Sequence, residues 1–215
     1  MTTPLKLFIA WGAAYLLGSL PPGILWAKLL KRIDVRQHGS GRTGGTNVWR
    51  TSGWLAALLT AICDGLKGAG GIWIARALGV GPWAVALAGM LGVVGHNYSI
   101  YLGFAGGAGT MISIGIAGAL WGGNLPLLVL LAVAAGGLVG HASVASILIA
   151  LALPGLSYWH GGWPTALGFG LPTLFLTLWA LRPNIQRLFK REERFLPLFY
   201  KKPPLVQISK HTPRE

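Results

Sequence analysis

Long apolar segments, separated by short groups of Gly, Pro and polar residues, dominate the chain. A helix needs roughly 20 apolar residues to cross a bilayer, and fewer where its ends are buried in protein. Seven segments are candidates: 4–26, 54–78, 83–103, 110–123, 125–140, 143–158 and 164–181. The fourth to sixth are short, and fusion of two of them would leave five or six crossings. The pattern predicts an all-α integral membrane protein with about seven transmembrane helices.

The composition supports this prediction. The 215 residues are 53% hydrophobic and only 11% charged, whereas a soluble domain usually carries about 25% charged residues. From Ala77 to Leu181 there is no Asp, Glu, Lys or Arg, and a water-facing surface cannot stay hydrated over so long a stretch without charge. The single cysteine, Cys63, excludes a disulfide scaffold and a CxxC zinc site.

Basic residues predict the orientation. Of the 18 Lys and Arg residues, 15 lie in the segment 27–53 or from Arg182 onward. Such blocks next to apolar segments are typical of cytoplasmic loops that face anionic lipid, so the formal charge of +13 indicates a membrane surface and no nucleic acid. We expect the N-terminus outside and the C-terminus in the cytoplasm. Residues 1–190 would form one membrane domain, and 191–215 a basic cytoplasmic tail.

The first basic loop carries the most chemical information. Four glycines within 39–45 allow successive backbone N–H groups to point into one concavity, and hydroxyl, amide and guanidinium groups add donors. The candidate phosphate-binding residues are Gly39, Ser40, Gly41, Arg42, Thr43, Gly44, Thr46 and Asn47. The G-x-G-x-x-G spacing does not indicate a dinucleotide site, because no βαβ unit surrounds it. A flexible Gly/Ser linker is the alternative.

Further polar residues lie inside or at the ends of the apolar segments. Asp64 and Lys67 are three residues apart on one helix face, so they form either a structural ion pair or part of the site. His96 ends a predicted span, and the turn with Gly106 and Gly107 follows it. Alone, a histidine in this position is typical of hydrogen-bonded helix contacts.

The same choice between structure and function applies to Ser143, which lies near His141 and Ser146, and to Asn184, which lies at the start of the tail. No His is followed at the right spacing by Asp in an H-x-x-x-x-D pattern, and G-x-S-x-G is absent. With two Asp residues before the tail, the sequence indicates no metal site and no organic cofactor.

Several motifs together resemble a known family. They are Gly18-Ser19-Leu20-Pro21, Asp34-Val35-Arg36, the loop from Gly39 to Arg50, and Asp64-Gly65-Leu66-Lys67-Gly68, with weaker agreement at 95–96, 103–109, Ser143 and 184–188. These segments resemble the bacterial acyl-phosphate-dependent glycerol-3-phosphate acyltransferases, the PlsY family. The resemblance covers most of the chain, and it implies a seven-span enzyme of the bacterial inner membrane with its active site at the cytoplasmic face.

The resemblance also implies a reaction in phospholipid biosynthesis. Family members transfer an acyl group from acyl phosphate to the 1-hydroxyl of glycerol 3-phosphate, which gives lysophosphatidic acid. The loop Gly39–Asn47 would bind the acyl phosphate, and Arg50, Ser143 and Asn184 would bind glycerol 3-phosphate. Because an acyl phosphate is already activated, no catalytic side chain is assigned and positioning suffices. The bilayer would admit the acyl chain through a groove between spans, and no obligate protein partner is implied.

The chain also departs from the family pattern. Ala105 and Ala108 stand where the family has lysines, Leu181 stands where it has histidine, and Arg42 stands where it has asparagine. The cations expected around the acceptor phosphate are therefore missing. A second hypothesis keeps acyl-phosphate chemistry but changes the acceptor or greatly lowers the activity. A third is a non-enzymatic transporter or membrane scaffold.

Overall fold

The computed structural model describes residues 1–122 and 125–199, and within these ranges the chain is helical apart from one isolated bridge between Ser99 and Ala105. The α-helices are α1 (Thr3–Ser19), α2 (Pro22–Lys31), α3 (Gly45–Ser52), α4 (Trp54–Ala77), α5 (Pro82–Asn97), α6 (Thr110–Trp121), α7 (Leu125–Val139), α8 (Ala142–Thr165), α9 (Leu171–Ala180) and α10 (Arg182–Phe189). Short 3₁₀ turns are η1 (Val35–Gln37), η2 (Ile100–Leu102) and η4 (Pro197–Phe199), and the π-helix η3 (Ala166–Gly170) leads into α9.

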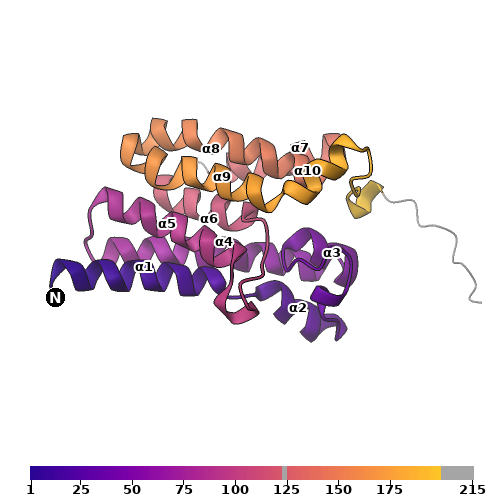
Figure 1. The fold of residues 1–215 in the computed structure, drawn as a ribbon, viewed down its shortest axis with the longest axis horizontal. Helices are drawn as coiled ribbons and strands as arrows, with labels where there is room; N and C mark the ends of the chain where they lie inside the picture. Colours follow the sequence, from indigo (N-terminus) through magenta and orange to yellow (C-terminus); the bar gives the residue numbers. More distant parts are fainter. Residues whose placement is uncertain (123–124, 200–215) are drawn as a thin grey trace, which may run out of the picture.

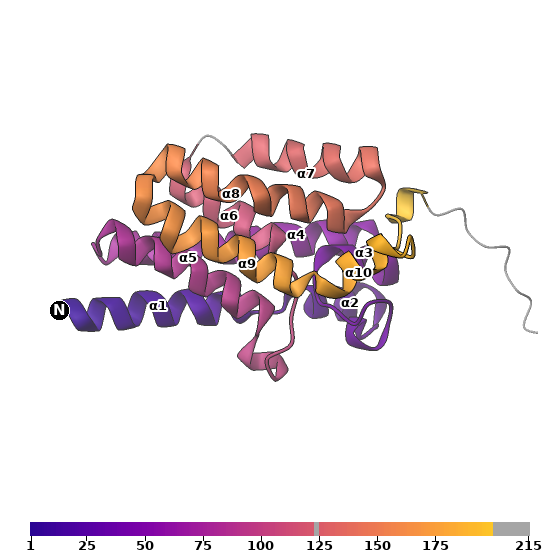
Figure 2. The ribbon, with the colours of Figure 1, turned by 45° about the horizontal axis from the view of Figure 1, so that its top comes forward.

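The long helices run side by side as an elongated bundle (Figure 1). Helix α1 packs on α4 and α5, α4 packs on α6, and α8 packs on α7, η3 and α9. The short helices α2, α3 and α10 gather at the end of the bundle opposite the N-terminus, as Figures 1 and 2 both show. This end, here called the polar end, collects residues 32–53 and 182–199, which are far apart in the sequence.

Seven apolar helical segments lie close to the predicted positions, and the all-α prediction is confirmed for the described residues. Helices α4, α6 and α7 match the expected segments to within two residues at each end. Three helical stretches, Thr3–Lys31, Trp54–Ala77 and Ala142–Ala180, are long and apolar enough to cross a membrane. The number of crossings and their orientation stay predictions.

Four expected spans differ from the structure. The sixth, 143–158, continues as α8 to Thr165, and the seventh, 164–181, begins as α9 only at Leu171, after η3. The first, 4–26, is interrupted, because α1 ends at Ser19 and α2 begins at Pro22. Two consecutive prolines remove two backbone donors and restrict the preceding residues to extended conformations, which ends the first helix. The third, 83–103, ends as a helix at Asn97, after which the chain enters the turn around η2.

A chain reversal separates the last two apolar segments. Gly162, with φ 64° and ψ −160°, interrupts the helical conformation near the end of α8. A side chain would be strained at this positive φ, whereas glycine adopts it freely. The following residues lead through η3 into α9, which runs back along α8 (Figure 2).

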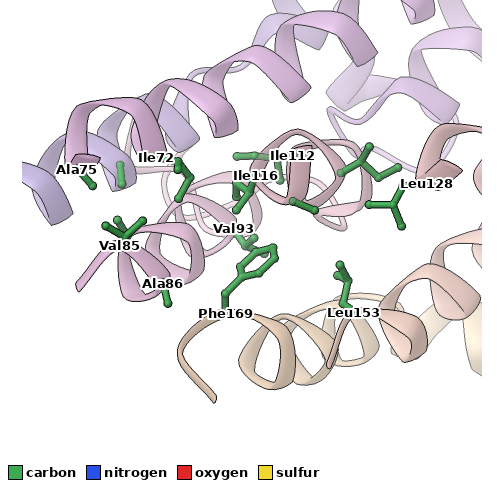
Figure 3. Packing of buried hydrophobic residues seen from close by; sticks show 14 of the residues in the cluster. Ile72, Ala75, Val85, Ala86, Val93, Ile112, Ile116, Leu128, Leu153 and Phe169 are labelled. Atoms are coloured by element: carbon green, nitrogen blue, oxygen red, sulfur yellow. The ribbon is translucent and has the colours of Figure 1, made fainter. Parts of the chain in front are cut away.

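The main apolar core lies between α4, α5, α6, α8 and η3. Phe169 is fully buried and points toward Val93 and Ile116, with Ile72 and Leu153 nearby (Figure 3). Gly89 leaves the space that this ring needs, because a Cβ there would lie 3.0 Å from both Phe169 and Ile116. The core is thus filled by a few large side chains against small residues.

Apolar side chains also cover much of the outer surface. Phe8, Leu138, Trp159 and Phe175 are all more than three-fifths exposed, and they lie on four different helices. A water-soluble monomer rarely shows apolar area of this extent. These faces are those expected of helices that contact lipid.

Close helix contacts depend on glycine. A Cβ on Gly115 of α6 would lie 2.1 Å from the carbonyl oxygen of Gly65 on α4, whereas a Cβ on Gly137 of α7 would have no atom within 4 Å. Small residues of this kind let membrane helices approach closely.

We expect Gly115→Ala to force α4 and α6 apart. Overpacking of a close contact costs about 1–3 kcal/mol, which corresponds to a fall in Tm of roughly 2–12 °C for a chain of this size. Gly137→Ala is the matched control and should leave the Tm unchanged or slightly raised, since alanine favours helix. Thermal unfolding of the purified protein in detergent measures both, and equal melting temperatures would contradict the assigned contact.

Candidate functional site

The glycine-rich loop of the polar end is organised by one buried side chain, Asn47 at the start of α3. Its Nδ2 donates to the carbonyl oxygens of Val35 at 3.1 Å, His38 at 3.1 Å and Arg42 at 2.9 Å. Its Oδ1 accepts from the backbone N–H of Ser40 at 2.9 Å. Asn47 therefore holds the loop in shape from inside.

Glycine is required at several positions in and around this loop, either by the backbone conformation or by close packing. Gly39 and Gly41 have φ of 63° and 72°, in the left-handed region that glycine adopts without strain. A Cβ on Gly39 would lie 2.2 Å from Asn47 Oδ1, and a Cβ on Gly23 of α2 would lie 1.9 Å from the carbonyl oxygen of Thr43. The loop lies tightly on α2 and α3, which argues against a flexible linker.

The approach to the loop is fixed by an exposed ion pair. Asp34 accepts from the backbone N–H of Arg36 at 3.1 Å and pairs with its guanidinium at 2.7 Å. These hydrogen bonds lower the pKa of Asp34 to about 2. The carboxylate is therefore ionised at neutral pH and caps η1, which leads into the loop.

A second group of polar residues surrounds a buried carboxylate, Glu193. Its Oε1 accepts from Ser143 Oγ of α8 at 3.1 Å and from Asn184 Nδ2 of α10 at 2.7 Å. Its Oε2 accepts from Arg187 Nε of α10 at 2.8 Å. Ser143 and Asn184, both expected from the sequence to bind the acceptor, thus meet at one point.

Arg50 joins this group from α3. Its Nη2 donates to the carbonyl oxygens of Arg194 and Phe195, each at 3.2 Å, and its buried Nε has no hydrogen-bond partner in the described residues. Burial is the main cause that lowers the pKa of Arg50, and the charge of Glu193 opposes the shift. His141 stacks on the ring of Phe195 at 4.4 Å between ring centroids, which holds the segment after Glu193 against α8.

Arg42 connects the loop with the second group. Its backbone belongs to the glycine-rich loop, but its half-buried side chain donates to the carbonyl oxygen of Ala180 at the end of α9. Burial, followed by the charge of Arg187, lowers the pKa of Arg42, while Glu193 raises it. The charges of Arg187 and Glu193 therefore act on the guanidinium of Arg42.

Asp64, Lys67 and His96 form a separate buried cluster between helices. Lys67 Nζ lies 2.8 Å from Asp64 Oδ1, and His96 Nδ1 lies 3.4 Å from the same oxygen. Lys67 also donates at 2.6 Å to the carbonyl oxygen of Leu20, where α1 ends. The cluster therefore ties α4 and α5 to the break between α1 and α2, and direct contact of these residues with substrate stays a prediction.

Gly106 and Gly107 allow the turn before α6 to lie on His96. A Cβ on Gly106 would be 2.0 Å from the His96 carbonyl oxygen, and one on Gly107 would be 2.1 Å from Nε2 of its ring. Ala105 is exposed in this turn, and Ala108 is half-buried. The turn thus carries no cation toward the polar end.

An apolar groove of about 590 Å³ opens beside the polar end. Its lining residues are Tyr98, Phe175, Leu176, Leu178, Trp179, Arg182 and Ile185. The guanidinium of Arg182 lies 3.3 Å from the ring centroid of Trp179 and supplies the charge at this otherwise apolar surface. An apolar groove with a cation beside it suits a ligand with a long alkyl chain and an anionic end.

Sequence reasoning missed Glu193 and did not assign Arg187 to the site. The sequence offers little to mark these two residues as functional, because a Glu or Arg in a basic tail is typical of a solvated surface. Among the described residues, no group of three His, Cys, Asp or Glu side chains could hold a metal ion. The polar end instead combines a glycine-rich loop, hydroxyl and amide groups and several arginines, a combination suited to phosphate groups.

Fold and polar end together define an all-helical protein of membrane type with a candidate anion site at one end of its bundle. A family model described as glycerol-3-phosphate acyltransferase matches residues 8–191. The chain belongs to the glycerol-3-phosphate acyltransferase family, and the resemblance found in its motifs is confirmed.

Individual relatives agree with this assignment. The glycerol-3-phosphate acyltransferase of Gloeobacter violaceus is 39% identical over 201 residues, which cover 90% of this chain and 96% of that protein. A protein of the same name from Thermus thermophilus is 38% identical over 196 residues, covering 85% and 92%. The crystal structure of PlsY (YgiH), an integral membrane glycerol 3-phosphate acyltransferase in its glycerol 3-phosphate form, superposes with a TM-score of 0.81 at 30% identity, covering 91% of this chain and 100% of that chain.

We expect Asn47→Asp to open the glycine-rich loop. The change places a carboxylate oxygen where Nδ2 now faces three carbonyl oxygens, and one buried group left without its hydrogen bond costs about 1–3 kcal/mol. A change of about 1.4 kcal/mol in the free energy of loop opening raises the population of the open loop about tenfold, so trypsin should cut after Arg42 about tenfold faster.

Limited proteolysis of the purified protein in detergent, with sequencing of the fragments, measures this rate. Thr46→Val is the control, because it removes a hydroxyl beside Asn47 that takes no part in these hydrogen bonds. Unchanged cleavage in the Asn47 variant would show that the amide does not hold the loop.

Proposed function

We propose that this protein transfers an acyl group from acyl phosphate to the 1-hydroxyl of glycerol 3-phosphate and releases lysophosphatidic acid. The observation that carries the proposal is the meeting of Ser143, Asn184 and Arg187 on one carboxylate beside Arg50. These residues come from three helices, and their donors suit a phosphate oxygen. Membership of the acyltransferase family supports the same activity.

The acceptor site consists of Arg50, Ser143 and Asn184, with Arg187 added. Arg187 contacts Glu193 through Nε, and its guanidinium has four further N–H groups that can bind phosphate. Glu193 fixes the positions of Ser143, Asn184 and Arg187, and the N–H groups of Arg50, Asn184 and Arg187 that stay unused would bind the acceptor. Preorganised donors avoid the cost of ordering side chains on binding.

The donor site is the glycine-rich loop. Backbone N–H groups around Gly39, Ser40 and Gly41, with the hydroxyls of Ser40, Thr43 and Thr46, would bind the phosphate of the acyl phosphate. The Gly44 backbone completes the turn into α3. Asn47 acts as a positioning residue, because its amide is used inside the loop.

The reaction needs position and charge stabilisation more than a catalytic side chain. The 1-hydroxyl oxygen attacks the acyl carbonyl carbon, the bond from that carbon to the phosphate oxygen breaks, and inorganic phosphate takes up the hydroxyl proton. Donors aimed at the leaving phosphate stabilise its growing charge. Holding both reactants together supplies much of the remaining acceleration.

The apolar groove beside Trp179 and Arg182 would hold the acyl chain. Its wall is α9, whose last carbonyl, that of Ala180, is bonded to Arg42 of the donor loop. The phosphate would therefore stay at the polar end while the chain lies among apolar side chains. This lining is largely aromatic and aliphatic.

The polar end would face the cytoplasm of a bacterial cell with the helices in the inner membrane. The described parts of the two basic segments, 27–53 and 182–199, lie at this same end of the bundle, in agreement with the positive-inside rule. The N-terminus at the opposite end would lie outside. Residues 1–190 would act as one membrane domain followed by a basic tail.

We expect the purified protein to form lysophosphatidic acid from palmitoyl phosphate and glycerol 3-phosphate. Ser143→Ala removes the hydroxyl that holds Glu193 beside Asn184 and Arg187, and the loss of this hydrogen bond to a charged group, about 1.5 kcal/mol, should raise the KM for glycerol 3-phosphate about tenfold. Ser146→Ala is the matched control, because its hydroxyl lies on the same helix end, donates to the carbonyl oxygen of Ala142 and accepts from Thr110 of α6, but does not contact Glu193.

Three other outcomes would contradict the proposal. Acylation of a different alcohol or amine, without product from glycerol 3-phosphate, would favour the changed acceptor. Absence of acyl transfer to any acceptor would favour a transporter or scaffold. Equal effects of both serine variants would remove Ser143 from the acceptor site.

Orientation is tested by cysteine labelling in a Cys63→Ser background. Gln37 and Ala77 are both exposed, one at the polar end and one at the end of α4. We expect Gln37→Cys to react with a membrane-impermeant maleimide only after permeabilisation of the cells, and Ala77→Cys to react in intact cells. The reverse pattern would place the polar end outside.

A further inference from the structure

Arg42 lies between the two proposed substrate sites. Its neighbours in sequence form the donor loop, yet its guanidinium reaches the carbonyl oxygen of Ala180, two residues before α10 begins at Arg182. Asn184 and Arg187 of the proposed acceptor site lie on that helix. The side chain therefore leaves the donor loop and enters the acceptor side.

The charges around Glu193 do not balance. Arg187 pairs with Glu193 at 2.8 Å, and Arg50 donates to the carbonyl oxygens of Arg194 and Phe195, directly after Glu193. Burial is the main cause that lowers the pKa of Arg42 and of Arg50; Arg187 adds to both shifts, Arg194 adds to that of Arg50, and Glu193 opposes them. Like charges that are partly buried are unfavourable without an anion. The guanidinium groups outnumber the one buried carboxylate, and this excess suits a dianionic phosphate.

Two neighbouring parts of the acceptor side supply no cation. Leu181, which follows Ala180, is buried and apolar, and the turn that contains Ala105 and Ala108 carries no charge. The contact to Ala180 also has a purely structural interpretation, since a guanidinium at the end of α9 caps that helix. The two interpretations differ in which substrate is affected when Arg42 is changed.

We propose that Arg42 binds the phosphate of glycerol 3-phosphate together with Arg50 and Arg187, from a loop whose backbone binds the donor. This inference rests on the proposed acyl transfer. Arg42 would set specificity for a dianionic acceptor and hold the two substrates in register. The donor phosphate would remain bound by backbone N–H groups and hydroxyls of the loop.

The test uses two variants and one control. Arg42→Asn removes the charge, and Arg42→Lys keeps the charge but loses the planar pair of donors. Arg32→Asn is the control, because Arg32 is an exposed residue that precedes the same loop and its φ of 56° is one that asparagine tolerates. Each of the three variants keeps a polar side chain at the changed position. Arg32→Asn removes one positive charge, as Arg42→Asn does.

Steady-state kinetics with palmitoyl phosphate give the first readout. We expect Arg42→Asn to raise the KM for glycerol 3-phosphate on the order of 10- to 100-fold and to leave the KM for palmitoyl phosphate within about twofold. Arg42→Lys should lie between this variant and the unchanged protein. Arg32→Asn should change neither constant.

The second readout changes the charge of the acceptor. The methyl ester of glycerol 3-phosphate carries one negative charge instead of two, so the loss caused by Arg42→Asn should be several-fold smaller with this acceptor. A coupling between residue and ligand charge of this kind is not produced by a helix cap. The same measurement on Arg32→Asn should show no coupling.

Two results would overturn the inference while the proposed function stands. One is active protein in which Arg42→Asn raises only the KM for palmitoyl phosphate. The other is an equal loss with both acceptors, or no change at all, which would leave Arg42 as a structural cap. If the unchanged protein forms no lysophosphatidic acid, the proposed function itself fails. If Arg42→Asn does not fold, Arg42→Lys decides by the same two readouts.

Discussion

A buried carboxylate requires partners, and the polar end is built around this requirement. Glu193 is 7% exposed and satisfies its two oxygens with Ser143, Asn184 and Arg187. An ionised group without such donors would be strongly destabilised at this depth. Glu193 therefore draws α8, α10 and the segment after α10 to one point. The proposed acceptor site exists because these elements meet there.

The apolar bundle provides the rigid support for that point. Helices of the charge-free stretch 77–181 pack through shape and a few hydrogen bonds, such as that from Thr110 to Ser146. Glycines such as Gly115 and Gly89 bring neighbouring helices into close contact. The buried cluster of Asp64 and Lys67 fixes the place where α1 ends. With the helices held in this way, short elements at the polar end need few contacts to become ordered.

Much of the fold follows from the sequence because the membrane imposes strong constraints. The absence of charge predicts helices, since only helices or closed barrels satisfy backbone groups in lipid. The helix limits of α4, α6 and α7 were predictable from Gly, Pro and polar residues. The interruption at Pro21 was visible as well, but hydropathy continues across it, so apolar pattern alone joined two helices into one span.

The candidate site shows where sequence reasoning ends. The hypothesis of a phosphate-binding loop came from glycines and donors that are contiguous in sequence, where local geometry depends on neighbours, and it stays a prediction. Three contacts could not be read from the sequence: the hydrogen bonds of Asn47 inside the loop, those of Asn184 and its neighbours to Glu193, and that of Arg42 to Ala180. They join residues up to 138 positions apart. Such contacts are set by how helices pack, and only the tertiary structure decides them. The sequence by itself determined the helices and the family, because these follow from local composition and contiguous motifs.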